Sequence, residues 1–130
     1  VWLRRKGRMF VTNSIVHGNR LDDGSSVNIG RHTSHIDTAI SCDHVCTSNT
    51  TGVTFVGDGN ITNRPPLFVD AAGGDYRLTK TSPCVDAGVY LSWMNGAKDL
   101  DGKDRKMGEA VDMGCYELTP PPRGSLISIR

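Results

Sequence analysis

The stretch MFVTNSIVHGN, residues 9–19, is a short run of apolar and β-branched residues that ends in turn-forming Gly and Asn. Runs of the same kind recur as SSVNIG at 25–30, SHIDTAISC at 34–42 and GVTFVGDGNIT at 52–62. Short β-branched runs between polar turns are typical of strands, and no stretch free of Gly and Pro has the apolar spacing of a helix. The sequence therefore predicts an all-β protein.

The spacing of these runs favours a repeating architecture. Ile15, Ile40 and Ile61 lie in similar contexts, at intervals of 25 and 21 residues. A loose repeat of roughly 20 to 30 residues with Asn-rich corners is typical of a solenoid that stacks parallel strands. Three Asp-Gly pairs would also suit the hairpins of an antiparallel sandwich, so the pattern alone leaves both folds open.

Composition limits the possible partners. The chain has 130 residues, the length of one domain, and a net charge of +1. The basic cluster RRKGR at 4–8 has no interleaved aromatic residues, so we expect no nucleic-acid partner. We expect no membrane span because no run of 18 apolar residues occurs. The basic N-terminal segment lacks the apolar core of a secretory signal, so we expect no signal peptide within this chain.

Prolines and glycines divide the chain. Pro65 and Pro66 cannot donate to a sheet ladder, and Gly, Asp and Pro become denser after Asp70. The segment TPPPRG at 119–124 is typical of an extended tail. We therefore predict a basic N-terminal extension at 1–10, β-helix rungs at 11–70, a cap at 71–117 and a flexible tail at 118–130.

The four cysteines allow several states. Cys42, Cys46, Cys84 and Cys115 would suit one or two disulfides, with three connectivities when all four pair. Buried free thiols are the alternative. Zinc is disfavoured because Cys84 and Cys115 each lack a nearby second cysteine.

Three segments resemble a known family. They are GNITNRPPLFVDAAGGDYRLTKTSPCVDAG at 59–88, DLDGKDR at 99–105 and AVDMGCYE at 110–117. Their order and spacing resemble the C-terminal segment of bacterial right-handed parallel β-helix proteins of the choice-of-anchor Q type. In that family the order is DPLFVD, DYRL, SPAIDAG or SPCIDAG, DLDGNPR, and VDIGAYE or VDMGAYE.

The resemblance implies a short right-handed parallel β-helix of about three rungs, pectin lyase-like in fold, followed by an irregular C-terminal cap. Family members are usually longer and exported, which implies an extracellular or cell-surface location. In this interpretation residues 99–117 close the end of the solenoid, whose open edge would otherwise expose unpaired backbone.

The acidic cluster around Gly102 is a candidate metal site. Asp99, Asp101 and Asp104 would supply the oxygen ligands that calcium prefers. An EF-hand spacing fails because Lys103 stands where an oxygen donor is needed, and Asp-Gly is ordinary turn chemistry. We predict no cofactor, with calcium at these three aspartates as the alternative.

Arg105 is the predicted centre of the cap. A guanidinium holds a carboxylate through two parallel hydrogen bonds, and Asp86, Asp112 and Glu117 stand beside Gly or apolar residues that indicate partial burial. Because buried carboxylates need partners, we predict that Arg105 clamps one or two of them and pins the cap.

Catalytic candidates lie in the polar run at 31–44. His35 and Asp37 on one strand would point to the same face and form an acid–base pair, with His44 as a further candidate. Exposed turn residues are the commoner explanation, and no motif identifies a reaction.

We therefore predict a non-catalytic β-helix terminal domain that is structural or associates with carbohydrate, with polysaccharide as a possible partner. One alternative is a small polysaccharide lyase or glycoside hydrolase that uses the carboxylates and histidines of 31–44. The other is a homo-oligomeric assembly module that self-associates through the open end of the β-helix.

Overall fold

The computed structural model describes residues 2–3, 7–31 and 38–120. Within these ranges the protein is all-β, with one 3-10 turn, η1, and no α-helix, which confirms the predicted class. None of the described helical segments is long and apolar enough to cross a membrane. The strands are β1 (Trp2–Leu3), β2 (Gly7–Val16), β3 (Ile29–Arg31), β4 (Thr38–Thr47), β5 (Thr50–Thr51), β6 (Thr54–Phe55), β7 (Phe68–Asp70) and β8 (Asp75–Leu78), and η1 covers Ser92–Met94.

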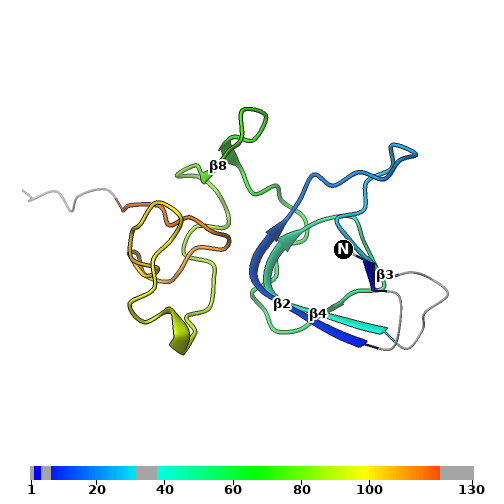
Figure 1. Cartoon of the computed structure of the whole chain (residues 1–130), viewed down its shortest axis with the longest axis horizontal. Coiled ribbons are helices and arrows are strands. Elements are labelled where there is room, and N and C mark those ends of the chain that lie inside the picture. The colour runs from blue at the N-terminus through cyan, green and yellow to red at the C-terminus, as the bar shows by residue number, and fades with distance from the viewer. Residues whose placement is uncertain (1, 4–6, 32–37, 121–130) are drawn as a thin grey trace, which may run out of the picture.

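The first six strands form two parallel three-stranded sheets, in the orders β1-β3-β5 and β2-β4-β6. Each pass of the chain contributes one strand to each sheet: the first pass holds β1 and β2, the second β3 and β4, the third β5 and β6. In Figure 1 the strands β2 and β4 nearly superpose, and β3 lies across the ring from their curved part. Parallel pairing excludes the antiparallel sandwich for these strands.

The two long strands bend together at one corner. β2 pairs with β4 from Gly7↔Thr38 to Val16↔Thr47, with Asn13 and His44 left out of the register. Both residues have a positive φ, 49° for Asn13 and 51° for His44, which Asn and His adopt more readily than β-branched residues do. β2 begins at Gly7, so its first four residues fall in the stretch predicted as an N-terminal extension.

The corner separates two cores. An inner core lies between the two sheets and contains Val11, Ile29, Ile40, Cys42 and Val45. Beyond the corner, alternate side chains point out of the ring and build an outer core with residues far along the chain. The buried members of the outer core are Cys46, Leu78, Cys84 and Met113, with Ile15, Ile61 and Phe68 packed against them.

Residues 68–118, which we call the cap, cover this outer core. Ile15, Cys46 and Ile61 come from the first, second and third pass, and they stack through the pairs Ile15↔Cys46 and Cys46↔Ile61. The cap therefore lies along the flank of the passes (Figure 1), whereas the sequence predicted a closed end of the solenoid. The corner explains this position, because it turns the stacked side chains of Ile15, Cys46 and Ile61 outward, where they would meet water without a cover.

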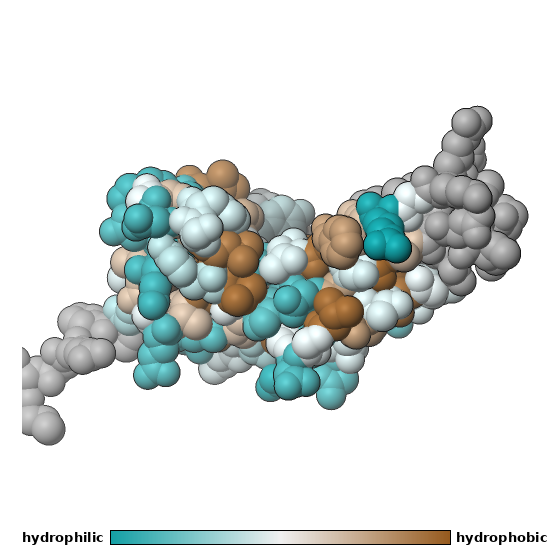
Figure 2. Space-filling model, turned by 90° about the horizontal axis from the view of Figure 1, so that it is seen from below, coloured by the Kyte–Doolittle hydropathy of each residue, from teal (hydrophilic) through white to brown (hydrophobic). Residues whose placement is uncertain are grey.

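The cap itself has little regular structure. It begins with the antiparallel hairpin β7–β8, which crosses the predicted boundary between residues 70 and 71. The rest is held by isolated bridges, Gly88↔Val111 and Lys98↔Asp104, and by η1. On the face seen in Figure 2 the apolar residues form small separate patches among polar ones. A segment so poor in ladder bonds needs other partners for its backbone groups.

Candidate functional site

Asp99 organises the turn DLDGK in the cap. Its Oδ1 accepts hydrogen bonds from the backbone N–H groups of Asp101 and Lys103, both 2.8 Å, and its Oδ2 accepts one from Glu117 N at 2.9 Å. Burial alone would raise the pKa of Asp99, but these three N–H donors outweigh it and lower the pKa. The carboxylate thus replaces the ladder bonds that the turn lacks.

The carboxylates of Asp112 and Asp86 also accept backbone N–H groups, in the neighbouring segments of the cap. Asp112 accepts hydrogen bonds from Asp86 N and from Leu118 N, both at 2.7 Å, and is almost fully buried. Asp86 in turn accepts one from Ala110 N at 3.0 Å. Burial raises the pKa of Asp112, although both N–H donors oppose the shift. These carboxylates tie the VDAG and VDMG segments to each other.

Arg105 meets Glu117 in the interior of the cap. Arg105 Nη1 lies 3.1 Å from Glu117 Oε1, and their side chains are 7% and 1% exposed. The two groups are not aligned as a hydrogen bond, so the contact is ionic. Arg105 Nη1 also donates to the carbonyl of Gly114 at 3.1 Å. Of the three predicted acidic partners, the structure brings Arg105 into an ion pair with Glu117 alone among the described residues.

Glu117 has the most perturbed carboxyl group of the described residues. Burial raises its pKa to about 7, against the stabilising N–H of Asp112 and the charge of Arg105. The charges of Asp112 and Asp99 raise the pKa further. Glu117 Oε2 accepts the N–H of Asp112 at 3.1 Å, so the side chain is a structural link rather than an open acid.

The calcium candidates each have a separate partner. Asp101 binds Arg77 through two hydrogen bonds of 2.9 and 2.7 Å, and Asp104 pairs with Lys98. With Asp99 committed to backbone donors, the three carboxylates do not converge. Among the described residues no group of three His, Cys, Asp or Glu side chains is placed to hold a metal ion. Calcium binding stays a prediction.

Of the three catalytic candidates, the structure describes His44. His35 and Asp37 lie outside the described residues. His44 occupies the corner of β4, with its Nδ1 2.9 Å from Asp43 Oδ1. A Cβ on Gly59 would come within 2.3 Å of the His44 ring, so the ring packs flat against the third pass. This packing gives His44 a role in the corner, and the structure brings no described nucleophile to it.

Asn13 is the main polar anchor between the passes and the cap. Its Oδ1 accepts a hydrogen bond from Val89 N at 2.7 Å, and its Nδ2 donates to Val89 O at 2.6 Å. Its own carbonyl accepts the N–H of Gly114 at 2.9 Å. The approach is close: a Cβ on Gly88 would meet Val111 and Asn13 within 3.0 Å. Sequence reasoning noted Asn at the corners but missed this contact across 76 residues.

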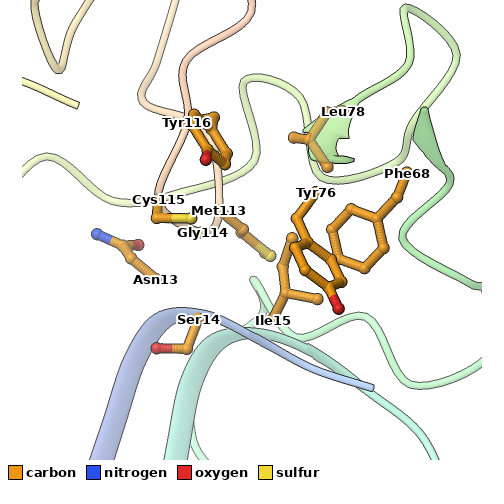
Figure 3. Close-up of a pocket in the computed structure, with 10 residues that line it drawn as sticks. All are labelled: Asn13, Ser14, Ile15, Phe68, Tyr76, Leu78, Met113, Gly114, Cys115 and Tyr116. Atoms are coloured by element: carbon orange, nitrogen blue, oxygen red, sulfur yellow. The ribbon is translucent and has the colours of Figure 1, made fainter. Parts of the chain in front are cut away.

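An aromatic cleft opens where the cap meets β2. The cleft has a volume of about 440 Å³, and its lining includes Ile15 and Met113 and the rings of Phe68, Tyr76 and Tyr116. Figure 3 shows Asn13 and Ser14 on the side away from Phe68 and Tyr76, with the polar ends of both side chains turned away from these rings. A mainly apolar pocket with a few polar groups at its border is the usual form of a small-molecule site.

The aromatic rings of the cleft are held in different ways. Phe68 and Tyr76 pack edge to face with centroids 5.4 Å apart, and Tyr76 remains 51% exposed. Arg77 lies 5.1 Å from the ring centre of Tyr116, and Asp101 fixes the guanidinium. The cation therefore covers part of Tyr116, while Tyr76 offers the freer ring. No sequence pattern pointed to these three aromatic residues as a group.

The cysteines fall into three environments. Cys42 is in the inner core, Cys46 and Cys84 are in the outer core, and Cys115 is exposed at the border of the cleft. Cys42 and Cys46 would face the same side of a regular strand, but the corner at His44 sends them to opposite sides. All four are free thiols in this structure.

The chain was compared with family models, with curated proteins and with solved structures, and none of the three comparisons gave a match. Membership in the choice-of-anchor Q β-helix family therefore stays a prediction from the motifs quoted above.

Proposed function

We propose that this chain is the non-catalytic terminal domain of a right-handed parallel β-helix of three rungs, in which the cap locks the rungs together. The handedness follows from the rule that parallel crossovers are right-handed in nearly all proteins. The motifs shared with exported β-helix proteins support the same interpretation, together with an extracellular or cell-surface location.

One observation carries the proposal: the cap contacts each of the three passes. Asn13 and Ile15 engage it from the first pass, Cys46 from the second and Ile61 from the third. Short parallel ladders such as β5 and β6, with two residues each, have little stability alone. A cover that touches all passes makes their unfolding cooperative with its own.

The substitution Asn13→Gly tests the locking role. It removes both side-chain hydrogen bonds to Val89 while keeping a residue that tolerates the positive φ. We expect the free energy of unfolding to fall by about 2 to 3 kcal/mol, because two backbone groups lose their partners. Hydrogen exchange should become faster at Val89 and Gly114 and also along β4.

The matched control is Asn49→Gly. Asn49 has the same φ of 49°, and among the described residues its side chain forms a hydrogen bond with Ser26 at 3.2 Å and none with the cap. We expect the free energy of unfolding of Asn49→Gly to stay within roughly 0.5 kcal/mol of the wild-type value. Faster exchange confined to the cap in Asn13→Gly, with β4 still protected, would make the cap an independent appendage and contradict the locking role.

A second function, carbohydrate binding, is favoured by the aromatic cleft. A sugar ring presents an apolar C–H face and a border of hydroxyl groups, which suits the exposed ring of Tyr76 and its hydroxyl group. The cleft volume of about 440 Å³ lies in the range of small-ligand pockets. We propose that the cleft binds a short stretch of polysaccharide at its surface.

Co-sedimentation with insoluble neutral and acidic polysaccharides tests this binding. Tyr76→Ala should weaken retention by at least about tenfold, whereas Tyr90→Ala, similarly exposed but outside the cleft, should not. Equal retention of both variants, or no retention of the wild type, would show that the cleft is not a polysaccharide-binding site. Release of new reducing ends by the wild type would instead support the enzymatic alternative at 31–44.

A further inference from the structure

Two buried thiols from distant parts of the chain meet in the outer core. Cys46 comes from β4 and Cys84 from the SPCVDAG segment of the cap, and neither is exposed to solvent. Both pack in the same buried cluster, close enough for each thiol to shift the pKa of the other, and the Cys46 thiol donates to the carbonyl of Arg64 at 3.7 Å. Free cysteines are common in cores, but two neighbouring thiols in one core cluster have the proximity that a disulfide needs.

The surrounding backbone holds both residues in place. Cys46 is paired on both sides, with Ile15 of β2 and with Ile61. Cys84 donates its N–H to Ser82 Oγ at 3.1 Å, and its carbonyl accepts the N–H of Met113 at 3.0 Å. These bonds fix the backbone positions of both residues. The contact therefore belongs to the fold itself.

The other two cysteines are placed away from this pair. Cys42 lies in the inner core, on the opposite side of β4 from Cys46. Cys115 is exposed and belongs to neither core. Of the three ways to pair four cysteines, the structure thus favours one bond and leaves two thiols over.

We propose that Cys46 and Cys84 form a disulfide under oxidising conditions and that this bond staples the cap to the second pass. The oxidant is a small disulfide such as oxidised glutathione. One cysteine thiolate attacks it and releases one glutathione thiolate, and the second cysteine then displaces the other. The two cysteines lose two electrons and two protons, and oxidised glutathione becomes two molecules of glutathione.

The roles of the two thiols differ. The neighbouring Cys46 thiol lowers the pKa of Cys84, and the neighbouring Cys84 thiol together with burial raises the pKa of Cys46. In the docked fold the Cys84 thiol is therefore the more acidic of the two. Because glutathione cannot reach a fully buried thiol, the exchange takes place while the cap is still undocked, during folding. The bond then closes a long loop between two elements that otherwise meet only by packing.

The test is oxidative refolding of the full chain in a glutathione buffer, followed by alkylation and cleavage before aspartates. This cleavage puts the cysteines on four separate peptides, 37–42, 43–57, 75–85 and 112–130. We expect peptide 43–57 to be linked to peptide 75–85, with Cys42 and Cys115 alkylated. Any other linkage, or four alkylated cysteines, would overturn the proposal.

The melting temperature gives the second measurement. The oxidised wild type should melt higher than the reduced protein by roughly 10 °C, because the crosslink restricts the unfolded chain. Cys46→Ala and Cys84→Ala should lose this difference, whereas Cys42→Ala and Cys115→Ala should keep it. Comparing the two redox states of one variant cancels the cost of the substitution itself. A difference that survives in Cys46→Ala would refute the staple.

Discussion

Glu117 shows how the burial of one side chain becomes a property that can be measured. Its carboxyl lies among Arg105, Asp112 and Asp99, and its pKa in the folded protein is about 7, against an ordinary value of 4.5. Between these two values the folded state still holds a proton that the unfolded state has released. The free energy of unfolding should therefore fall as the pH rises from about 4.5 to about 7, by on the order of 3 kcal/mol.

The control is Glu117→Gln, which keeps an oxygen for the N–H of Asp112 but cannot titrate. Urea unfolding of both proteins from pH 4.5 to 8 should give a slope in the wild type that is absent or much smaller in the variant. Asp99 has a lowered pKa, so it affects the free energy of unfolding only below this pH range, where that energy falls as the pH falls. Equal slopes in the two proteins would mean that Glu117 ionises normally in the folded state.

At the scale of elements, the strands were largely predictable and their surroundings were not. Runs such as MFVTNSIV became β2 because their β-branched residues suit a pleated surface. The flank position of the cap depends on the positive φ of Asn13 and His44, which reverses the side-chain alternation. A simple period of two assigns Ile15 and Cys46 to the inner core, so sequence reasoning had no signal for an outer one.

The cap elements illustrate the same limit in another way. The acidic residues of DLDGK and VDMG suggested both a metal loop and an arginine clamp, because carboxylates serve either purpose. In the structure Asp99 and Asp112 mainly accept backbone N–H groups, a use that depends on which donors the fold leaves without a ladder. Sequence spacing records the acids but not those donors. The aromatic cleft was equally hidden, since Phe68 and Tyr116 are far apart in the sequence and line one cleft only once the cap has folded.

At the scale of the whole molecule, the two ends of the parallel stack differ. β2 has ten residues and lies at the edge of its sheet, with β4 as its only partner among the described strands. At the other end β5 and β6 have two residues each. Phe10, in the middle of β2, is 74% exposed. A long edge strand with an exposed aromatic residue is a template for pairing with another chain.

This asymmetry predicts a dimer rather than a fibre. Two copies can pair their β2 edges about a twofold axis, whereas head-to-tail stacking would need a matching long edge at the other end. Light scattering should give a mass that rises with concentration from 14.1 kDa towards twice that value and then stops. Phe10→Lys, which places a charge on the edge, should restore the monomer mass. A constant 14.1 kDa for the wild type at every concentration would show that the β2 edge does not pair, and a mass that keeps growing would show that the short end pairs as well.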